Sequence, residues 1–170
     1  GSPRRTQPGE KRSGVMPDKR RTAAIIGGGV IGSGWATRFL LNGWDVRFFD
    51  PSPNAERILH PVIERGREAM PALCDVVPEE GSLYIASSTA EAVEAALYIQ
   101  ESTPERIEVK QAVLKSIQES CDANAIVASS TSGFMPSELQ EGAIRPEQII
   151  VSHPYNPVYL LPLVEVVASP

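Results

Sequence analysis

A glycine-rich loop that follows a short apolar run constrains the fold of this chain more than any other feature. The run covers residues 22–27, and the loop consists of Gly27, Gly28, Gly29, Val30, Ile31 and Gly32. Apolar residues at helical spacing come next, which predicts a strand, a tight turn and a helix in that order. This order with the spacing GxGxxG is typical of a turn that binds the pyrophosphate of a dinucleotide. The amides at the start of the helix, at Val30 and Ile31, are expected to face the phosphates.

A carboxylate follows the loop at a distance that fits the same motif. Asp50 lies 18 residues after Gly32, at the end of a second predicted strand over residues 45–50. A carboxylate in this position accepts both hydroxyls of the adenosine ribose and repels a 2′-phosphate, which favours NAD over NADP. Two alternatives stay open: Asp50 caps the turn that follows it, or Arg47 or Arg57 reaches the ribose and weakens the preference.

Strand and helix patterns alternate along the rest of the chain. Further apolar runs predict strands at residues 82–87, 97–101, 125–130, 149–152 and 163–167. This alternation predicts an α/β fold: a Rossmann-type, doubly wound, mostly parallel sheet with helices on both faces. A chain of 170 residues with 42% hydrophobic residues is long enough for one domain with its own core.

Two of the connecting helices carry distinct signals. Residues 54–75 predict a long helix, although Pro61 and Pro71 interrupt the pattern. Its inward residues are expected to be Ile58, Val62 and Met70. The later helix is expected to begin with Thr103 as N-cap and Pro104 as its first residue. Its inward stripe is expected at Ile107, Val113, Leu114 and Ile117.

The amino-terminal residues differ in composition from the rest. The first 22 residues contain seven of the 16 basic side chains and two of the 21 acidic ones, which leaves 9 basic and 19 acidic residues in the remainder. We expect residues 1–20 to be a disordered tail or an added leader, with Met16 as a natural start, and residues 21–170 to form the NAD-binding domain. The acidic remainder argues against nucleic-acid binding, while a basic tail that contacts an acidic partner is the alternative for the first segment.

Other features limit the class of protein. No run reaches the roughly 18 apolar residues of a membrane span, and no secretory signal is present. Cys74 and Cys121 occur without a CxxC pair or a neighbouring histidine, so we expect reduced thiols, no disulfide framework and no metal site. A cytoplasmic protein is expected.

The chain has two histidines, His60 and His153. Oxidation of an alcohol by a nicotinamide cofactor needs a base with a near-neutral pKa, which histidine supplies. His60 lies within a predicted helix with no other polar residues converging on it, and we interpret it as structural. His153 ends a predicted strand, where loops beyond parallel strands line the ligand site. A buried histidine bonded to the backbone is the alternative for His153.

Four segments resemble the 3-hydroxyacyl-CoA dehydrogenase superfamily, over about residues 22–168. They are GGGVIGSGWA, IQESTPERIEVKQAVL, SSTSGFMPSEL and SHPYNPVYLLPLVEVV. The last is the most specific, and it is similar to the branch of L-carnitine and L-gulonate dehydrogenases. The resemblance implies an NAD-dependent oxidoreductase acting on a 3-hydroxyl group, with L-carnitine oxidised to 3-dehydrocarnitine.

The resemblance also assigns the catalytic residues. A histidine, a glutamate 12 residues later and a serine 21 residues earlier correspond to His153, Glu165 and Ser132. In this assignment His153 takes the hydroxyl proton, Glu165 holds the imidazole and Ser132 hydrogen-bonds the hydroxyl. The resemblance places Glu101 near the nicotinamide ring, with a structural carboxylate before a helix as the alternative.

Members of the family have a further helical domain, which supplies an asparagine, closes over the substrate and forms a homodimer. Nothing matching that domain occurs in this sequence, so the chain is expected to bind NAD but to turn over substrate poorly.

Acyl-CoA substrates are disfavoured because no lysine lies between Lys19 and Lys110 to bind CoA phosphates. Three arginines in that interval alternate with glutamates: Arg57, Arg65 and Arg67. The trimethylammonium group of carnitine is expected to bind against the face of an aromatic side chain. The aromatic candidates are Tyr155, Tyr159 and Trp35. A crystallin-like structural protein that binds NAD and a nucleotide-dependent regulator are the alternatives from other classes.

Overall fold

The computed structural model describes residues 20–169, which form one sheet of seven strands between layers of helices. The strands are β1 (Thr22–Ile26), β2 (Asp45–Phe49), β3 (Leu83–Ile85), β4 (Tyr98–Glu101), β5 (Ile126–Ser129), β6 (Ile149–Pro154) and β7 (Val164–Val167). Their order is β3-β2-β1-β4-β5-β6-β7, and all neighbours are parallel except β6 and β7. The Rossmann-type sheet predicted from the sequence is therefore confirmed. Except for Arg20, the predicted tail lies outside the described residues.

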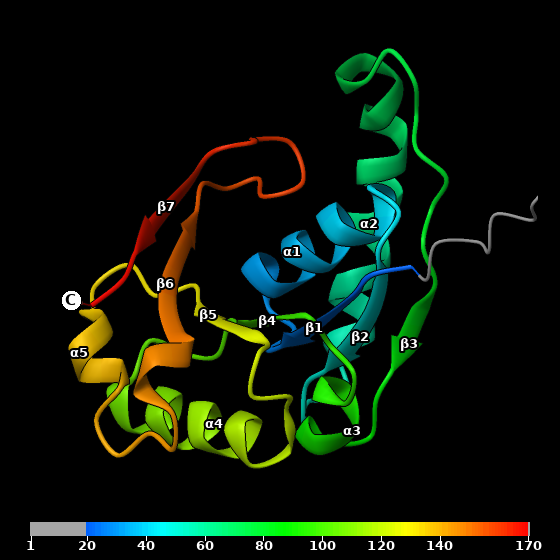
Figure 1. Ribbon diagram of the computed structural model, residues 1–170. Helices are drawn as coiled ribbons and strands as arrows, with labels where there is room; N and C mark the ends of the chain where they lie inside the picture. The colour runs from blue at the N-terminus through cyan, green and yellow to red at the C-terminus, as the bar shows by residue number, and fades with distance from the viewer. Residues whose placement is uncertain (1–19, 170) are drawn as a thin grey trace, which may run out of the picture.

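Helices cover both faces of the sheet (Figure 1). They are α1 (Val30–Leu41), α2 (Ala55–Leu73), α3 (Thr89–Val93), α4 (Ile107–Ser120) and α5 (Pro136–Leu139), with a 3₁₀ turn at Pro146–Gln148. α1 and α2 pack on one face, whereas α3 and α4 pack on the other. Within residues 20–169 no helix is both long and apolar enough to cross a bilayer.

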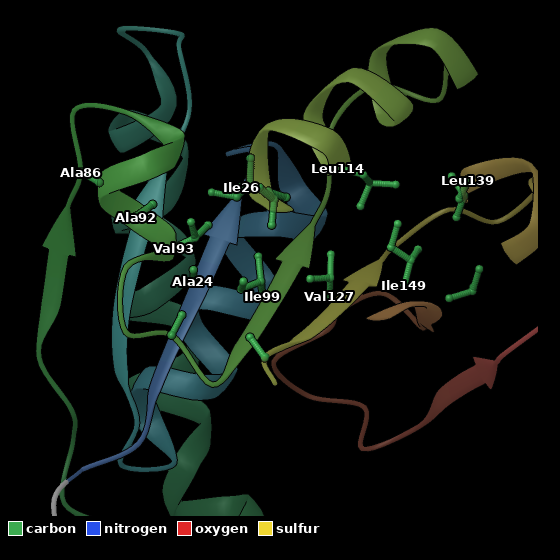
Figure 2. Packing of buried hydrophobic residues seen from close by; sticks show 14 residues of the cluster. Ala24, Ile26, Ala86, Ala92, Val93, Ile99, Leu114, Val127, Leu139 and Ile149 are labelled. Atoms are coloured by element: carbon green, nitrogen blue, oxygen red, sulfur yellow. The ribbon is translucent and has the colours of Figure 1, made fainter. Parts of the chain in front are cut away.

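The alternation of side chains along β1 divides the core in two. Ala24 and Ile26 point to the face covered by α3 and α4, where they join Val93, Leu114 and other residues in one apolar cluster (Figure 2). Ile25 points to the opposite face and packs with residues of α1 and α2. Each fully buried aliphatic side chain of this size stabilises the fold by about 1.5–3 kcal/mol.

Helix α2 confirms the long helix predicted over residues 54–75 and corrects one of its expected inward residues. It runs unbroken from Ala55 to Leu73 through Pro61 and Pro71. Ile58 is 41% exposed, while Leu59 is fully buried. The buried residues of α2 recur every three or four positions, as helical geometry requires. Leu59 belongs to this buried stripe, and Ile58, one position earlier, faces away from it. Packing of this stripe against α1 holds the helix together despite the donor that each proline removes.

Helix α4 begins at Ile107, with Arg106 as its N-cap, so the predicted start at Thr103 and Pro104 is wrong. The physical reason is a competing partner. The backbone amide and the hydroxyl of Thr103 both donate to the carboxylate of Glu101, each at 2.6 Å, and this holds Thr103 in the loop after β4.

The sheet brings the predicted site residues together at the carboxyl ends of its parallel strands. β1 lies between β2 and β4, so the chain order reverses beside it. In open α/β sheets, ligands bind beyond the carboxyl ends of the strands at such a reversal. The glycine loop follows β1, Ser132 lies in the loop after β5, and His153 lies near the end of β6.

Candidate active site

The glycine loop has the shape that a pyrophosphate requires. Gly27 has φ +105°, a left-handed conformation that side chains other than glycine rarely adopt. A Cβ at Gly32 would lie 1.8 Å from the carbonyl oxygen of Gly27, so only glycine allows this contact between helix and strand. At Gly29, by contrast, a Cβ would meet nothing within 4 Å. The backbone at Gly29 is therefore open to a bound group, and the loop fits a dinucleotide.

Asp50 lies against this loop. Its Oδ2 accepts from the backbone amide of Gly28 at 2.6 Å, and its Oδ1 accepts from the amide of Ser52 at 2.7 Å. The turn cap considered for Asp50 is thus present. Each carboxylate oxygen accepts more than one hydrogen bond, so both keep capacity for ribose hydroxyls. Arg47 is held over the Tyr84 ring, with 4.9 Å between guanidinium carbon and ring centroid.

His153 and Glu165 face each other across the β6–β7 pair. The antiparallel register pairs these two residues directly, and Nδ1 of His153 lies 3.0 Å from Oε2 of Glu165. A carboxylate only accepts hydrogen bonds, so Nδ1 carries the hydrogen. The lone pair of Nε2 is then free to accept a proton, which is the state that a general base needs.

Tyr155 is a third member of this group; the sequence analysis considered it only as an aromatic face for a cation and not as a partner of Glu165. Its hydroxyl donates to Oε1 of Glu165 at 3.1 Å, and its ring centroid lies 5.8 Å from that of His153. The hydrogen bond with His153, followed by that from Tyr155, lowers the pKa of Glu165 below its ordinary value. The carboxylate therefore stays ionised beside the imidazole.

A Tyr155→Phe variant is expected to raise the pKa of Glu165 toward its ordinary value, because one hydrogen bond to the ionised form is lost. Because the pKa of Glu165 is lowered, its contact with His153 is fully present at a pH above the ordinary carboxyl pKa. The contact is lost as the pH falls through the lowered pKa. The variant therefore loses the imidazole–carboxylate pair at a higher pH than the parent protein. NMR titration of the Glu165 carboxyl carbon measures this shift. Tyr159→Phe is the control, since Tyr159 lies in the same loop and has no hydrogen bond to Glu165 in the described structure.

A cavity of about 240 Å³ connects the glycine loop with the predicted base. Its lining residues are Ile31, Ser102, Thr103, Glu105, Lys110, Ser130, Ser132, His153 and Pro154. A second cavity of about 160 Å³ shares Ser132 and His153 and also contains Glu165. Ser132 thus lies in both cavities with His153, although no hydrogen bond joins the two side chains within residues 20–169. The structure brings together the three residues assigned as catalytic.

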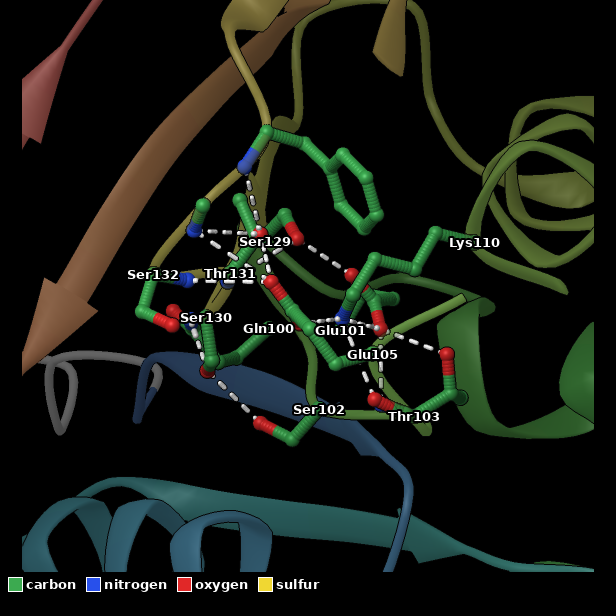
Figure 3. Close-up of polar contacts among 12 residues, drawn as sticks. Gln100, Glu101, Ser102, Thr103, Glu105, Lys110, Ser129, Ser130, Thr131 and Ser132 are labelled. Carbon is green, nitrogen blue, oxygen red and sulfur yellow. Dashed lines mark hydrogen bonds and ion pairs between the residues drawn. The ribbon is translucent and has the colours of Figure 1, made fainter. Parts of the chain in front are cut away.

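Glu101 lies beneath the first cavity rather than in its wall. The residue is fully buried. Its carboxylate accepts from Thr103, from Ser129 and from the ammonium of Lys110 at 3.0 Å (Figure 3). The structural role considered for Glu101 is therefore present. A contribution to the placement of the nicotinamide ring, which stays a prediction, would act through Thr103 and Lys110.

Lys110 and Glu105 are cavity residues that the sequence reasoning missed. Lys110 is 1% exposed, with its ammonium 3.3 Å from Glu105. Its position between Ile107 and Leu114, in the inward stripe of α4, indicated that this lysine is buried. A buried lysine is rarely unpaired, so the same position indicated an acidic partner. Glu105 accepts hydrogen bonds from Thr131 and from the backbone of the Ser132 loop. Burial raises the pKa of Glu105, but the Thr131 hydroxyl and Lys110 lower it by more, so the net shift is downward.

The remaining candidates lie elsewhere. His60 is exposed on α2, 3.7 Å from Glu56, and it does not line the cavity. Trp35 is 6% exposed and stacks on Phe39 in the core, which removes it as a candidate for a cation site. Tyr159 lines a separate cavity on the α2 side.

The sequence of this chain matches a known family. Residues 22–170 match the family described as 3-hydroxyacyl-CoA dehydrogenase, NAD binding domain. The chain belongs to this family. Its cofactor is accordingly NAD, in agreement with the geometry of the glycine loop.

Relatives refine this assignment. An L-carnitine dehydrogenase/betainyl-CoA thioesterase of Ruegeria pomeroyi is 62% identical over 150 residues, which cover 88% of this chain and 31% of the relative. An L-carnitine dehydrogenase of Mesorhizobium japonicum is 52% identical over 149 residues, which cover 86% of this chain and 41% of the relative. This chain therefore spans less than half of the length of these two relatives.

A solved structure has the same fold. It is a 5-formyl-3-hydroxy-2-methylpyridine 4-carboxylic acid 5-dehydrogenase, described as an NAD+-dependent dismutase, with a TM-score of 0.80 and 31% identity. The match covers 88% of this chain and 49% of that structure. The Rossmann-type fold is thus shared with a solved NAD-dependent enzyme.

Proposed function

We propose that the protein to which this chain belongs oxidises the 3-hydroxyl of L-carnitine to 3-dehydrocarnitine with NAD. The single observation that carries the proposal is the His153–Glu165 pair beside a glycine-loop cavity, in a chain 62% identical to an L-carnitine dehydrogenase. The base, the residue that orients it and the cofactor loop are the parts that oxidation of an alcohol requires.

The proposed mechanism follows from the hydrogen bonds of His153. With Nδ1–H donated to Glu165, the free Nε2 takes the proton of the substrate hydroxyl, and Glu165 stabilises the imidazolium that forms. Ser132, in the wall of the same cavity, donates a hydrogen bond to the substrate oxygen. When bound, NAD would accept the hydride from the carbon that carries the hydroxyl.

The arginines of α2 support carnitine over an acyl-CoA substrate. Arg67 is paired with Glu64 and with Glu80, so its charge is already balanced. Arg65 lines a separate cavity with Tyr159, and Arg57 is exposed on the helix surface. A site for the phosphates of CoA would need several positive side chains that are not already paired with carboxylates. The arginines of α2 do not form such a cluster. Tyr155 beside His153 offers an aromatic face to the trimethylammonium group.

A substrate screen tests the proposal. The complete product of the gene is mixed with NAD and with L-carnitine, L-gulonate or 3-hydroxybutyryl-CoA, while NADH absorbance is followed. We expect the highest kcat/KM with L-carnitine. Oxidation of the thioester or of L-gulonate alone would give the site a different substrate, and absence of turnover with all three would leave the crystallin-like or regulatory alternative.

The location and assembly of the protein belong to the same proposal. We infer a cytoplasmic protein, for which the free thiols of Cys74 and Cys121 are in keeping with a reducing compartment. A homodimer follows from the family resemblance. Light scattering on the complete gene product distinguishes a dimer from a monomer.

A further inference from the structure

Gln100 is a polar residue in the middle of the sheet. It lies on β4 between β1 and β5, opposite Ile25 and Ala128, and it is fully buried. A buried amide that lacks hydrogen-bond partners costs about 1–3 kcal/mol, so its partners reveal what it contributes. These partners are Tyr98, Ser130 and Ser152, which use both hydrogens of the amide nitrogen and one acceptor position of the amide oxygen.

The orientation of the amide follows from one of these partners. The carbonyl oxygen of Ser152 only accepts, so the atom 3.1 Å away must be the amide nitrogen, Nε2. The second hydrogen of Nε2 is donated to Oγ of Ser130 at 2.7 Å. Oε1 then faces Tyr98, whose hydroxyl donates to it at 2.7 Å. Burial raises the pKa of Tyr98, so this hydroxyl keeps its hydrogen.

This orientation makes Ser130, one of two bonded serines at the cavity wall, an acceptor toward Gln100. Ser130 must accept from Gln100, and its Oγ lies 2.7 Å from Oγ of Ser102 (Figure 3). The two hydroxyls share one hydrogen between them, whichever serine donates it. The other hydrogen has no acceptor within residues 20–169. Because both serines line the cavity that contains His153, the pair offers one hydroxyl donor to a bound group.

The position of Ser102 indicates which bound group this is. A Cβ at Gly27 would lie 2.5 Å from the carbonyl oxygen of Ser102, and a Cβ at Gly32 would lie 3.4 Å from its Cβ. Ser102 is therefore directly beside the glycine loop, while Ser130 lies toward Ser132 and His153 along the same wall. A group that meets this donor lies between the cofactor loop and the catalytic base.

We propose that Gln100 is a positioning residue that sets the Ser102–Ser130 pair as a hydrogen-bond donor to an oxygen of the nicotinamide riboside half of NAD. The proposal rests on NAD binding by this domain and is independent of the identity of the alcohol substrate. The accepting oxygen belongs either to the carboxamide of the nicotinamide or to its ribose. Both oxygens are uncharged hydrogen-bond acceptors. Gln100 itself does not contact the cofactor.

Calorimetric titration of the chain with NAD and with ADP-ribose tests the proposal in three variants. Gln100→Met removes the amide at similar volume, Ser130→Ala removes one hydroxyl of the pair together with its bond to Gln100, and Ser130→Thr keeps the hydroxyl. We expect the first two to weaken NAD binding by about 10-fold, the effect of one lost hydrogen bond, and the third to retain most of the affinity. Unchanged ADP-ribose affinity in the first two variants assigns the acceptor to the carboxamide, whereas an equal loss assigns it to the ribose.

Gln118→Met is the matched control. Gln118 is 2% exposed, bonds to Arg145 and Gln148, and lies outside the cavity. It is expected to lower the melting temperature without changing the affinity for NAD. Unchanged NAD affinity in folded Gln100→Met and Ser130→Ala would overturn the proposal, as would an equal loss in Gln118→Met. Failure of the parent chain to bind NAD would instead contradict the proposed function.

Discussion

His153→Gln is expected to lower kcat for NAD-dependent oxidation by about 100- to 10,000-fold, the usual contribution of a general base. Glutamine keeps a polar side chain of similar reach but has no lone pair that takes a proton near neutral pH. The affinity for NAD should stay unchanged, because we propose that the glycine loop and Asp50 hold the cofactor without His153. Steady-state rates of the complete gene product and calorimetric titration with NAD measure the two effects separately.

The other histidine supplies the control for this prediction. His60 is exposed on α2 and lies outside the cavity, so His60→Gln should leave both rate and affinity unchanged. Wild-type turnover in His153→Gln would contradict the role of His153 as the base. A parallel loss of NAD affinity would point to a structural role instead. A protein that binds NAD without catalysis would show no difference in rate between the parent and either variant.

The second large effect is expected in the glycine loop. A Gly29→Ala variant should fold with unchanged stability, since the added Cβ meets nothing within 4 Å and the backbone at Gly29 is extended. The methyl group occupies the space through which the pyrophosphate approaches, so the affinity for NAD should fall by about 10-fold or more. Thermal unfolding and calorimetric titration measure the two effects on the same sample.

Gly32→Ala serves as the contrast. Its Cβ would lie 1.8 Å from the carbonyl oxygen of Gly27, so the helix and the turn must move apart. We expect a loss of about 1–3 kcal/mol in the free energy of unfolding, as overpacked sites show. If Gly29→Ala were destabilised and Gly32→Ala were not, the two glycines would have the reverse of the roles derived from the loop geometry.

The sheet and the cofactor loop could be predicted from the sequence because they depend on local patterns. Apolar runs and glycine spacing are properties of consecutive residues, and they placed β1 and the loop after it correctly. The start of α4 could not be predicted in this way. Thr103 and Pro104 form a good helix start in isolation, but the buried carboxylate of Glu101 accepts from the amide and the hydroxyl of Thr103 and holds this residue in the loop after β4.

The candidate site depends more on tertiary contacts. The family resemblance supplied His153 and Glu165, whose contact results from the antiparallel register of β6 and β7, and no local pattern fixes that register. The bond from Tyr155 to Glu165 has the same origin. Lys110 was not singled out from the sequence, although its place in an apolar stripe indicated burial. Its partner Glu105 gave no comparable signal.

We propose that this chain holds NAD through its glycine loop and Asp50. Calorimetric titration of the 170-residue chain with NAD and with NADP measures this binding without a substrate. We expect NAD to bind at least about 10-fold more tightly, since the carboxylate accepts the ribose hydroxyls and repels a 2′-phosphate. Equal or tighter binding of NADP, or no binding of NAD by the folded chain, would contradict the claim.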